Sequence, residues 1–263
     1  MPTSPPPLSR LALEQLAVFE YGSLLATSPL LSVIPKGDGH PVLFLPGFLG
    51  SDSSTAQLRF VLAQFGHAPH RWHLGTNLGP HPGLLAQVSR RVAELHDRFG
   101  RKVSLVGWSL GGIYAREEAR DHPDMVRQVI TLASPFRWRP GDRTRVSALY
   151  DHLGPETDPF PGHATAEHDR PAMPVPSTSI YTRSDGIVRW CHCLEEAGDS
   201  RENIEVFGTH IGLGSNIAAV VAIADRLAQA DGQQWASFRP PAVIRHLYRA
   251  PAVWVASTSR RTP

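Results

Sequence analysis

The sequence predicts an α/β fold in which a mostly parallel β-sheet is covered by helices on both faces. Short apolar runs of strand length alternate with longer segments whose apolar residues recur at helical spacing. Several of these apolar runs end directly at glycine, which is typical of a strand that turns sharply into a helix. The runs are mostly apolar, which indicates strands buried on both faces of a sheet.

Composition is that of a globular enzyme-sized domain. The chain has 263 residues, of which 41% are hydrophobic and 19% charged, enough to enclose a substantial core and too apolar for a disordered chain. The formal net charge of +2 and the lack of a long basic stripe do not favour nucleic acid as a partner.

The elements follow one another in a regular order. After a helix at 8–28 and a turn at 37–39, the patterns predict strands at 42–45, 72–74, 103–106, 129–132, 179–181 and 204–207, and helices at 58–65, 84–99, 113–120 and 217–227. The strand at 204–207 is expected to be the last. The stretch after residue 235 carries no clear pattern.

One segment interrupts this alternation. Residues 136–176 are rich in proline and charge, and only 146–153 are periodic. About forty irregular residues are more than a connection between strands needs, so a lid or cap is expected there. The predicted division is an N-terminal helical extension at 1–40, a core at 41–135 and 177–235, the insertion at 136–176 and a tail at 236–263.

The cysteines and the N-terminal segment predict the compartment of the protein and its relation to membranes. Cys191 and Cys193 are separated by one residue, too close for an unstrained disulfide, which favours a reducing compartment. No secretory signal and no run of eighteen apolar residues is present, so a cytoplasmic protein without a transmembrane segment is expected. The helix at 8–28 is expected to pack on the domain; transient contact with a membrane surface is the alternative, disfavoured because its polar face carries acids.

The segment 107–111, with Ser109 at its centre, has the pattern G-x-S-x-G. A buried strand leads into it and a helix leaves it, so Ser109 lies on a sharp strand-to-helix turn that exposes its hydroxyl. The small residues around it let strand and helix approach closely, and the helix N-terminus favours a developing oxyanion. The pattern alone occurs by chance in Gly-rich chains; this context makes Ser109 the predicted nucleophile.

Acyl transfer also needs two N–H donors, a base and an acid. The strand at 42–45 runs into a glycine-containing turn, so the N–H groups of Phe48 and Leu110 are the expected oxyanion donors; a plain turn that starts a helix is the alternative. His210 follows the strand at 204–207 and is the predicted base, and Asp185 follows the strand at 179–181 and is the predicted acid. Asp199, Glu195 and Glu196 compete for the acid role, but their polar stretch indicates an exposed helix and loop.

These segments together resemble the α/β-hydrolase superfamily, and within it bacterial esterase- and lipase-like serine hydrolases. The resemblance covers about residues 41–227 and rests on LPGF at 45–48, GWSLGG at 107–112, TLASPF at 131–136, SDGIV at 184–188 and GTHIGL at 208–213. It implies a triad of Ser109, Asp185 and His210 with Phe48 and Leu110 at the oxyanion.

The chain also departs from the family pattern. Pro46 precedes Gly47 where many relatives have histidine, and no HGGG loop is present. The antiparallel strands that often open the fold are not recognisable, which implies a smaller sheet with reduced N-terminal strands.

Apolar residues near the chemistry predict an ester or lipid substrate with apolar acyl or aromatic groups. The expected substrate-binding residues are Leu49, Trp108, Phe136, Trp138, Ile187 and Ile211. Hydrolysis of carboxylic esters through an acyl-enzyme is the expected activity. An acyltransferase that uses the same triad and a non-catalytic binding protein on a hydrolase scaffold are the alternatives.

No cofactor and no metal are expected. His67, His70, His73 and His81 span a predicted strand and turn rather than one helix face, and Cys191 and Cys193 lack a second pair of ligands. Asn77, in a glycine-flanked turn after a predicted strand, is expected either at the rim of the site or in a purely local turn role. The sequence leaves the oligomeric state open.

Overall fold

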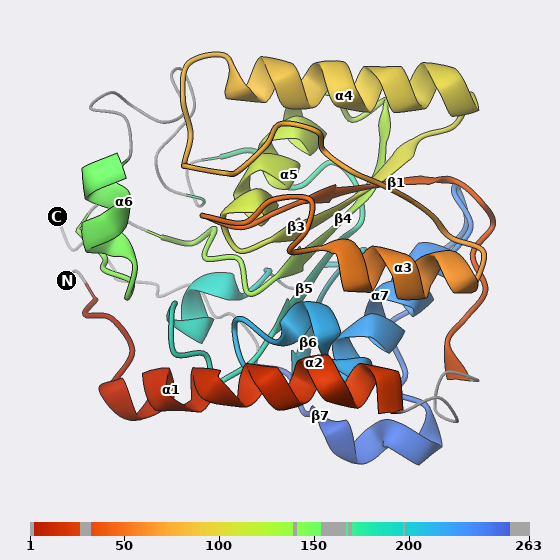
Figure 1. The fold of residues 1–263 in the computed structure, drawn as a ribbon. Coiled ribbons are helices and arrows are strands. Elements are labelled where there is room, and N and C mark those ends of the chain that lie inside the picture. Colours follow the sequence, from red (N-terminus) through yellow and green to blue (C-terminus); the bar gives the residue numbers. More distant parts are fainter. Residues whose placement is uncertain are drawn as a thin grey trace, which may run out of the picture.

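The computed structural model describes residues 3–26, 33–138, 141–153, 167, 170–196 and 198–252. Within them the chain forms one seven-stranded sheet in the order β2-β1-β3-β4-β5-β6-β7 (Figure 1). Strands β1 to β6 are parallel to their neighbours, and β7 is antiparallel to β6. The predicted α/β class with a mostly parallel sheet is confirmed.

The strands are short. The central strands β1, β3, β4 and β5 are buried along their whole length, as the apolar runs predict, whereas β2, β7 and the first half of β6 are not fully buried. Their bounds are β1 Pro41–Leu45, β2 Ala68–His70, β3 Val103–Trp108, β4 Val126–Leu132, β5 Ser177–Tyr181, β6 Arg201–Val206 and β7 Tyr248–Arg249. Leu45 pairs with Gly107, and Trp108 pairs with Leu132, so these strands end at one edge of the sheet. The turns that follow β1, β3, β5 and β6 therefore meet at that edge.

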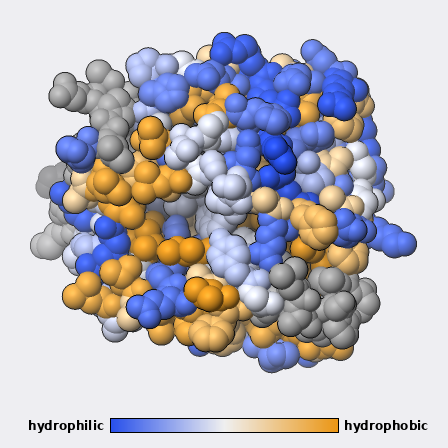
Figure 2. Space-filling view, in the orientation of Figure 1, coloured by the Kyte–Doolittle hydropathy of each residue, from blue (hydrophilic) through white to orange (hydrophobic). Residues whose placement is uncertain are grey.

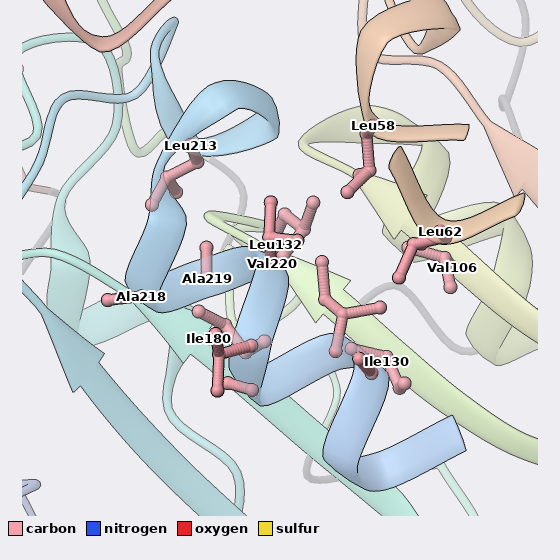
Figure 3. Close-up of a cluster of buried hydrophobic side chains, with 14 of the residues drawn as sticks. Leu58, Leu62, Val106, Ile130, Leu132, Ile180, Leu213, Ala218, Ala219 and Val220 are labelled. Carbon is pink, nitrogen blue, oxygen red and sulfur yellow. The ribbon is translucent and has the colours of Figure 1, made fainter. Parts of the chain in front are cut away.

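Helices cover both faces of the sheet (Figure 1). Helices α4 (Leu84–Phe99) and α5 (Leu110–Asp121) lie on one face, and α3 (Ala56–Gln64) and α7 (Ile217–Ala228) lie on the other. Each face has its own apolar core, one around Val88, Val92 and Leu105 and the other around the residues drawn in Figure 3. The alanines of α7, including Ala218 and Ala219, allow that helix to pack closely on the strands.

One predicted strand is displaced. The strand next to β1 is Ala68–His70, so the prediction of 72–74 is wrong. The carboxylate of Asp52 accepts hydrogen bonds from the main-chain N–H groups of Trp72 (3.0 Å) and His73 (3.3 Å). These N–H groups are therefore occupied by a side chain, and the apolar pattern at 72–74 reflects the burial of Trp72 rather than strand pairing.

The chain does not end its sheet at β6 as predicted. The 3₁₀ helix Ala242–Leu247 leads into β7, where Tyr248 and Arg249 pair with Val206 and Glu205. The Tyr248 hydroxyl donates to the carbonyl of Ala218 (2.8 Å), which fastens this return to α7. A two-residue strand has no periodic signal, so the sequence could not predict it. Residues 253–263 of the predicted tail lie outside the described residues.

The N-terminal segment is helical as predicted, but its orientation is reversed. It runs as α1 (Leu8–Leu13), a 3₁₀ turn at Glu14–Leu16 and α2 (Ala17–Ala26), one continuous rod along the lower edge of Figure 1. Glu14 is only 6% exposed, whereas Val18 and Phe19 are 73% and 74% exposed. The prediction of an outward acidic face is therefore wrong at Glu14. Figure 2 shows apolar side chains along this edge of the molecule.

Two further observations bear on the predicted organisation. Helix α6 (Ser147–Leu153) matches the periodic stretch within the predicted insertion, of which 139–140, 154–166 and 168–169 lie outside the described residues. None of the helices in the described ranges combines the length and apolar character that crossing a bilayer requires.

Candidate active site

Ser109 lies on the turn between β3 and α5, as predicted. Its backbone has φ 50° and ψ −119°, a region that residues with a side chain rarely adopt and that stores strain. Hydrogen bonds from Ser109 N to Leu132 O (2.8 Å) and from Ser134 Oγ to Ser109 O (2.6 Å) hold this conformation from β4 and the residues that follow it. The serine is partly exposed at the edge where the strands end.

The glycines around Ser109 allow close approach of three segments. A Cβ at Gly107 would overlap Gly112 at the start of α5, and a Cβ at Gly111 would overlap the main chain of β1 at Leu45. A Cβ at Gly112 would come within 2.5 Å of Ser134 Oγ. These contacts give the physical reason for small residues on both sides of the predicted nucleophile.

The predicted oxyanion loop lies beside Ser109. A Cβ at Gly47 would be 3.1 Å from Ser109 Cβ, and Phe48 is the next residue along the loop. Leu110 is the first residue of α5, where an N–H group has no acceptor within the helix. Phe48 and Leu110 therefore lie on the two segments that flank the serine.

Asn77 holds this loop in place. Its side-chain Nδ2 donates to Pro46 O (2.8 Å), and its main chain exchanges hydrogen bonds with the loop, from Leu49 N to Asn77 O (2.7 Å) and from Asn77 N to Gly50 O (2.8 Å). Asn77 Oδ1 accepts from Gly79 N (3.1 Å) and from the Tyr114 hydroxyl (3.2 Å). The sequence singled out Asn77 by its turn context, but its cross-link to the oxyanion loop required the structure.

Asp185 and His210 meet across the sheet edge. His210 Nδ1 lies 2.7 Å from Asp185 Oδ2, and both side chains are buried. The other oxygen, Asp185 Oδ1, accepts hydrogen bonds from the N–H groups of Ile187 and Val188 (2.8 Å each). This arrangement fixes the carboxylate and directs its second oxygen at the imidazole, so the turn contacts of Asp185 leave it able to bind His210.

The competing acid Glu195 is engaged elsewhere. It is buried rather than exposed, so the sequence interpretation of its surroundings is wrong. Glu195 forms an ion pair with Arg116 of α5 and accepts a hydrogen bond from Ser177 Oγ (2.7 Å). Burial acts to raise the pKa of this carboxyl, but Arg116 outweighs it and the pKa is lowered.

The environment of His210 favours its charged form. Burial lowers the pKa of the imidazole, yet the adjacent Asp185 carboxylate outweighs burial, and Glu14 adds a further raising effect. The pKa of His210 therefore lies above its ordinary value. A base with this property is stabilised once it has accepted a proton.

Trp108 connects the nucleophile strand to the histidine loop. Its indole Nε1 donates to His210 O (3.1 Å), and its ring packs against Gly214. In the described part of the chain, Ser109 Oγ and the His210 ring make no hydrogen bond to each other. Such bonds between nucleophile and base are often long in the absence of substrate.

The predicted substrate-binding residues divide by exposure. Leu49, Ile211 and Trp138 are exposed, and Ile187 is half-buried. The indole of Trp138 donates a hydrogen bond to Asp142 O (3.0 Å). Trp108 is buried under the histidine loop, and Phe136 is buried beneath the guanidinium of Arg116, 3.9 Å from the ring centre. These two buried aromatic residues therefore contribute to packing rather than to an exposed surface.

Among the described residues, no three His, Cys, Asp or Glu side chains gather as ligands for an ion. Cys191 and Cys193 are free thiols, and burial raises the pKa of each.

Comparison with solved structures identifies proteins that share this fold. Lipase B of Aspergillus fumigatus superposes with a TM-score of 0.57 at 18% identity, over 74% of this chain and 54% of that lipase. This chain thus spans about half of the length of that lipase. The chain has the α/β-hydrolase fold. Lipase BlEst2 of Bacillus licheniformis (TM-score 0.53, 17% identity, 74% of this chain and 94% of that one) and a monoacylglycerol lipase of Paleococcus ferrophilus (0.51, 16%, 72% and 96%) share it.

No family model matches this chain. At the level of the fold, these structures support the resemblance predicted from five short motifs. The identities are low, so the activity has to be argued from the residues themselves.

Proposed function

We propose that this chain is a serine hydrolase that cleaves carboxylic esters with apolar acyl or aromatic groups through Ser109, His210 and Asp185. The observation that carries the proposal is the buried 2.7 Å contact between Asp185 Oδ2 and His210 Nδ1 at the sheet edge where Ser109 lies on a strained turn. An imidazole oriented by a carboxylate is the base that a serine hydroxyl needs to become nucleophilic.

The proposed reaction begins with attack of Ser109 Oγ on the ester carbonyl. His210 accepts the hydroxyl proton at Nε2, because Asp185 occupies Nδ1. Negative charge moves to the carbonyl oxygen, where the N–H groups of Phe48 and Leu110 are the proposed donors. The charged imidazole then gives its proton to the departing alkoxide, and an acyl-enzyme remains on Ser109.

Water completes the cycle by the same steps. His210 removes a proton from water, the resulting hydroxide adds to the acyl carbon, and the bond to Ser109 Oγ breaks as the serine regains its proton. The Asp185 carboxylate stabilises the imidazolium in both halves. The raised pKa of His210 is consistent with this role.

Exposed apolar residues support an apolar substrate. Leu49 of the oxyanion loop and Ile211 of the histidine loop are 45% and 44% exposed, on the two sides of the proposed chemistry. Apolar side chains in such places favour acyl chains or aromatic groups over sugars and charged molecules.

A covalent probe tests the nucleophile. A fluorophosphonate should label the wild type and the Ser53→Ala variant, whose altered serine is exposed in the turn before α3, but not Ser109→Ala. Folding of all three proteins is checked by circular dichroism. Absence of labelling in the folded wild type rules out the hydrolase, and labelling of Ser109→Ala rules out this serine.

A panel of p-nitrophenyl esters tests the substrate class. The ratio kcat/KM should rise with acyl chain length and then level off once the apolar surface is filled. A flat profile across the panel contradicts an apolar acyl site.

A further inference from the structure

The carboxylate of Glu14 binds the two loops that carry Asp185 and His210. Glu14 Oε1 accepts hydrogen bonds from Gly186 N (2.8 Å) and His210 N (3.1 Å), and Oε2 accepts from Ile211 N (2.9 Å). One buried side chain from the N-terminal rod therefore satisfies three main-chain donors in two different loops. Hydrogen bonds of N–H groups to a carboxylate are stronger than those between neutral groups.

The position of these bonds matters for the candidate triad. Gly186 directly follows Asp185, and the other two donors are His210 itself and its neighbour. The distance between the acid and the imidazole depends on how the loop after β5 sits against the loop after β6. Glu14 joins the two loops within one residue of both side chains, so it fixes that relative position.

A second carboxylate of the same rod holds the histidine loop. Glu20 Oε2 accepts from Thr209 N (3.2 Å) and Thr209 Oγ1 (2.6 Å), and Glu20 Oε1 accepts from Asn216 Nδ2 (2.7 Å). Asn216 also caps α7 by accepting from Ala218 N and Ala219 N. The rod is therefore attached to the loop before and after His210.

Glycines on the catalytic loops make room for the rod. A Cβ at Gly186 would come within 2.5 Å of Arg10 O, and a Cβ at Gly212 would overlap the Glu20 carboxylate. A Cβ at Gly208 would come within 2.6 Å of Glu20 Oε1. Both loops thus match the N-terminal rod in shape as well as in hydrogen bonding.

We propose that Glu14 is a positioning residue for the triad, and that the N-terminal rod is a built-in part of the active site rather than a peripheral extension. The proposal rests on the proposed function for its catalytic meaning, whereas the loop geometry stands on the contacts alone. Two acidic groups face His210: Asp185 from the loop after β5 and Glu14 from the rod. A third, Glu20, binds the adjacent Thr209.

The test is Glu14→Gln, which keeps the size of the side chain but removes its charge and places an amide against an N–H donor. We expect kcat for a p-nitrophenyl ester to fall about ten- to a hundredfold with little change in KM, since small misplacement of catalytic groups costs that much. The pKa of the His210 imidazole, measured by NMR titration of the free protein, should fall, and the acid limb of the kcat/KM profile should move with it to lower pH.

The matched control is Gln15→Ala, which alters the exposed neighbour of Glu14 and should leave all three quantities unchanged. A folded Glu14→Gln protein with wild-type kcat and an unchanged His210 pKa overturns the proposal. If Glu14→Gln does not fold, Glu14→Asp retains the charge and shortens the side chain by one methylene; it should still lower kcat, and wild-type kcat in this variant also overturns the proposal.

The two proposals fail in different ways. A wild-type protein that neither hydrolyses esters nor reacts with a fluorophosphonate removes the proposed function. The His210 titration still decides the role of Glu14 in that case, because it needs no substrate. A lowered His210 pKa in Glu14→Gln then supports the loop contact, and an unchanged one overturns it.

Discussion

Trp108 donates its indole N–H to the main-chain carbonyl of His210 at 3.1 Å, and so joins the residue before the candidate nucleophile to the candidate base. Trp108 is the last residue of β3, and His210 lies in the loop after β6. Strands β4 and β5 lie between β3 and β6 in the sheet. This bond is a direct link across the sheet edge between two parts of the proposed triad.

Trp108→Phe should lower kcat severalfold while leaving the protein folded. The substitution keeps an aromatic ring against Gly214 but removes the indole N–H that donates to His210 O. The loss of this bond should lower the unfolding free energy by about 1 kcal/mol. Trp72→Phe is the matched control, because Trp72 is also buried and its indole donates to Gly75 O (3.0 Å). Urea unfolding and ester kinetics measure both effects. Equal losses of kcat in the two variants would show that the bond to His210 has no special role.

Asn77→Ala should weaken the oxyanion loop. It leaves the buried Pro46 O without its donor from Asn77 and Gly79 N without its acceptor, at a cost of about 1–3 kcal/mol in stability. Because the loop carries Phe48, kcat should fall about tenfold or more, less than the roughly hundred- to thousandfold loss that follows complete removal of an oxyanion donor. Tyr114→Phe removes the 3.2 Å hydroxyl contact to Asn77 but keeps the two bonds between Asn77 and the loop through Pro46 O and Leu49 N, and should retain most of kcat. Wild-type kcat in a folded Asn77→Ala protein contradicts a role for this cross-link.

His40 should make the fold sensitive to acid. Its ring joins Asp38 (2.5 Å) and Ser104 Oγ (2.7 Å) at the opposite end of β3 from Ser109, where the buried Ser104 hydroxyl has no access to substrate. Burial lowers the pKa of His40 to about 4, although Asp38 acts in the other direction and Arg127 and Arg101 add to the lowering.

The direction of this pH dependence follows from the pKa of His40 in the folded and in the unfolded protein. An unfolded histidine with a pKa near 6.5 accepts its proton first, so the stability that neutral His40 provides is complete above about pH 6.5 and is lost as the pH falls towards 4. The slope from this group is at most about 1.4 kcal/mol per pH unit. Urea unfolding of the wild type and of His40→Gln between pH 4 and pH 7 measures it. The difference between the two proteins isolates His40, because His67 and His70, whose pKa burial also lowers, are present in both. Parallel curves would contradict the prediction.

Sequence patterns alone predict the central strands of the sheet and the local turns of the candidate site, but not the outer strands β2 and β7. Apolar runs such as the one before Ser109 predict a strand because burial on both faces leaves no polar alternation, and a strand followed by glycines predicts the turn. These are short-range properties, so they can be read without knowing the partners of each segment. The order of Ser109, Asp185 and His210 along parallel strands then predicts that they share one edge, and the structure brings Asp185 and His210 into contact there.

The groups that support that edge come from distant parts of the chain and are identified by the fold. Glu14 looks like a surface acid of an amphipathic helix, because local pattern cannot reveal that three N–H groups about 170 to 200 residues away form its binding site. For the same reason the sequence leaves the role of Asn77 open and wrongly indicates that Glu195 is exposed. Their partners lie in other loops and helices. A buried polar group is stable only with its hydrogen-bond partners, and those partners are defined by packing rather than by neighbours in the chain.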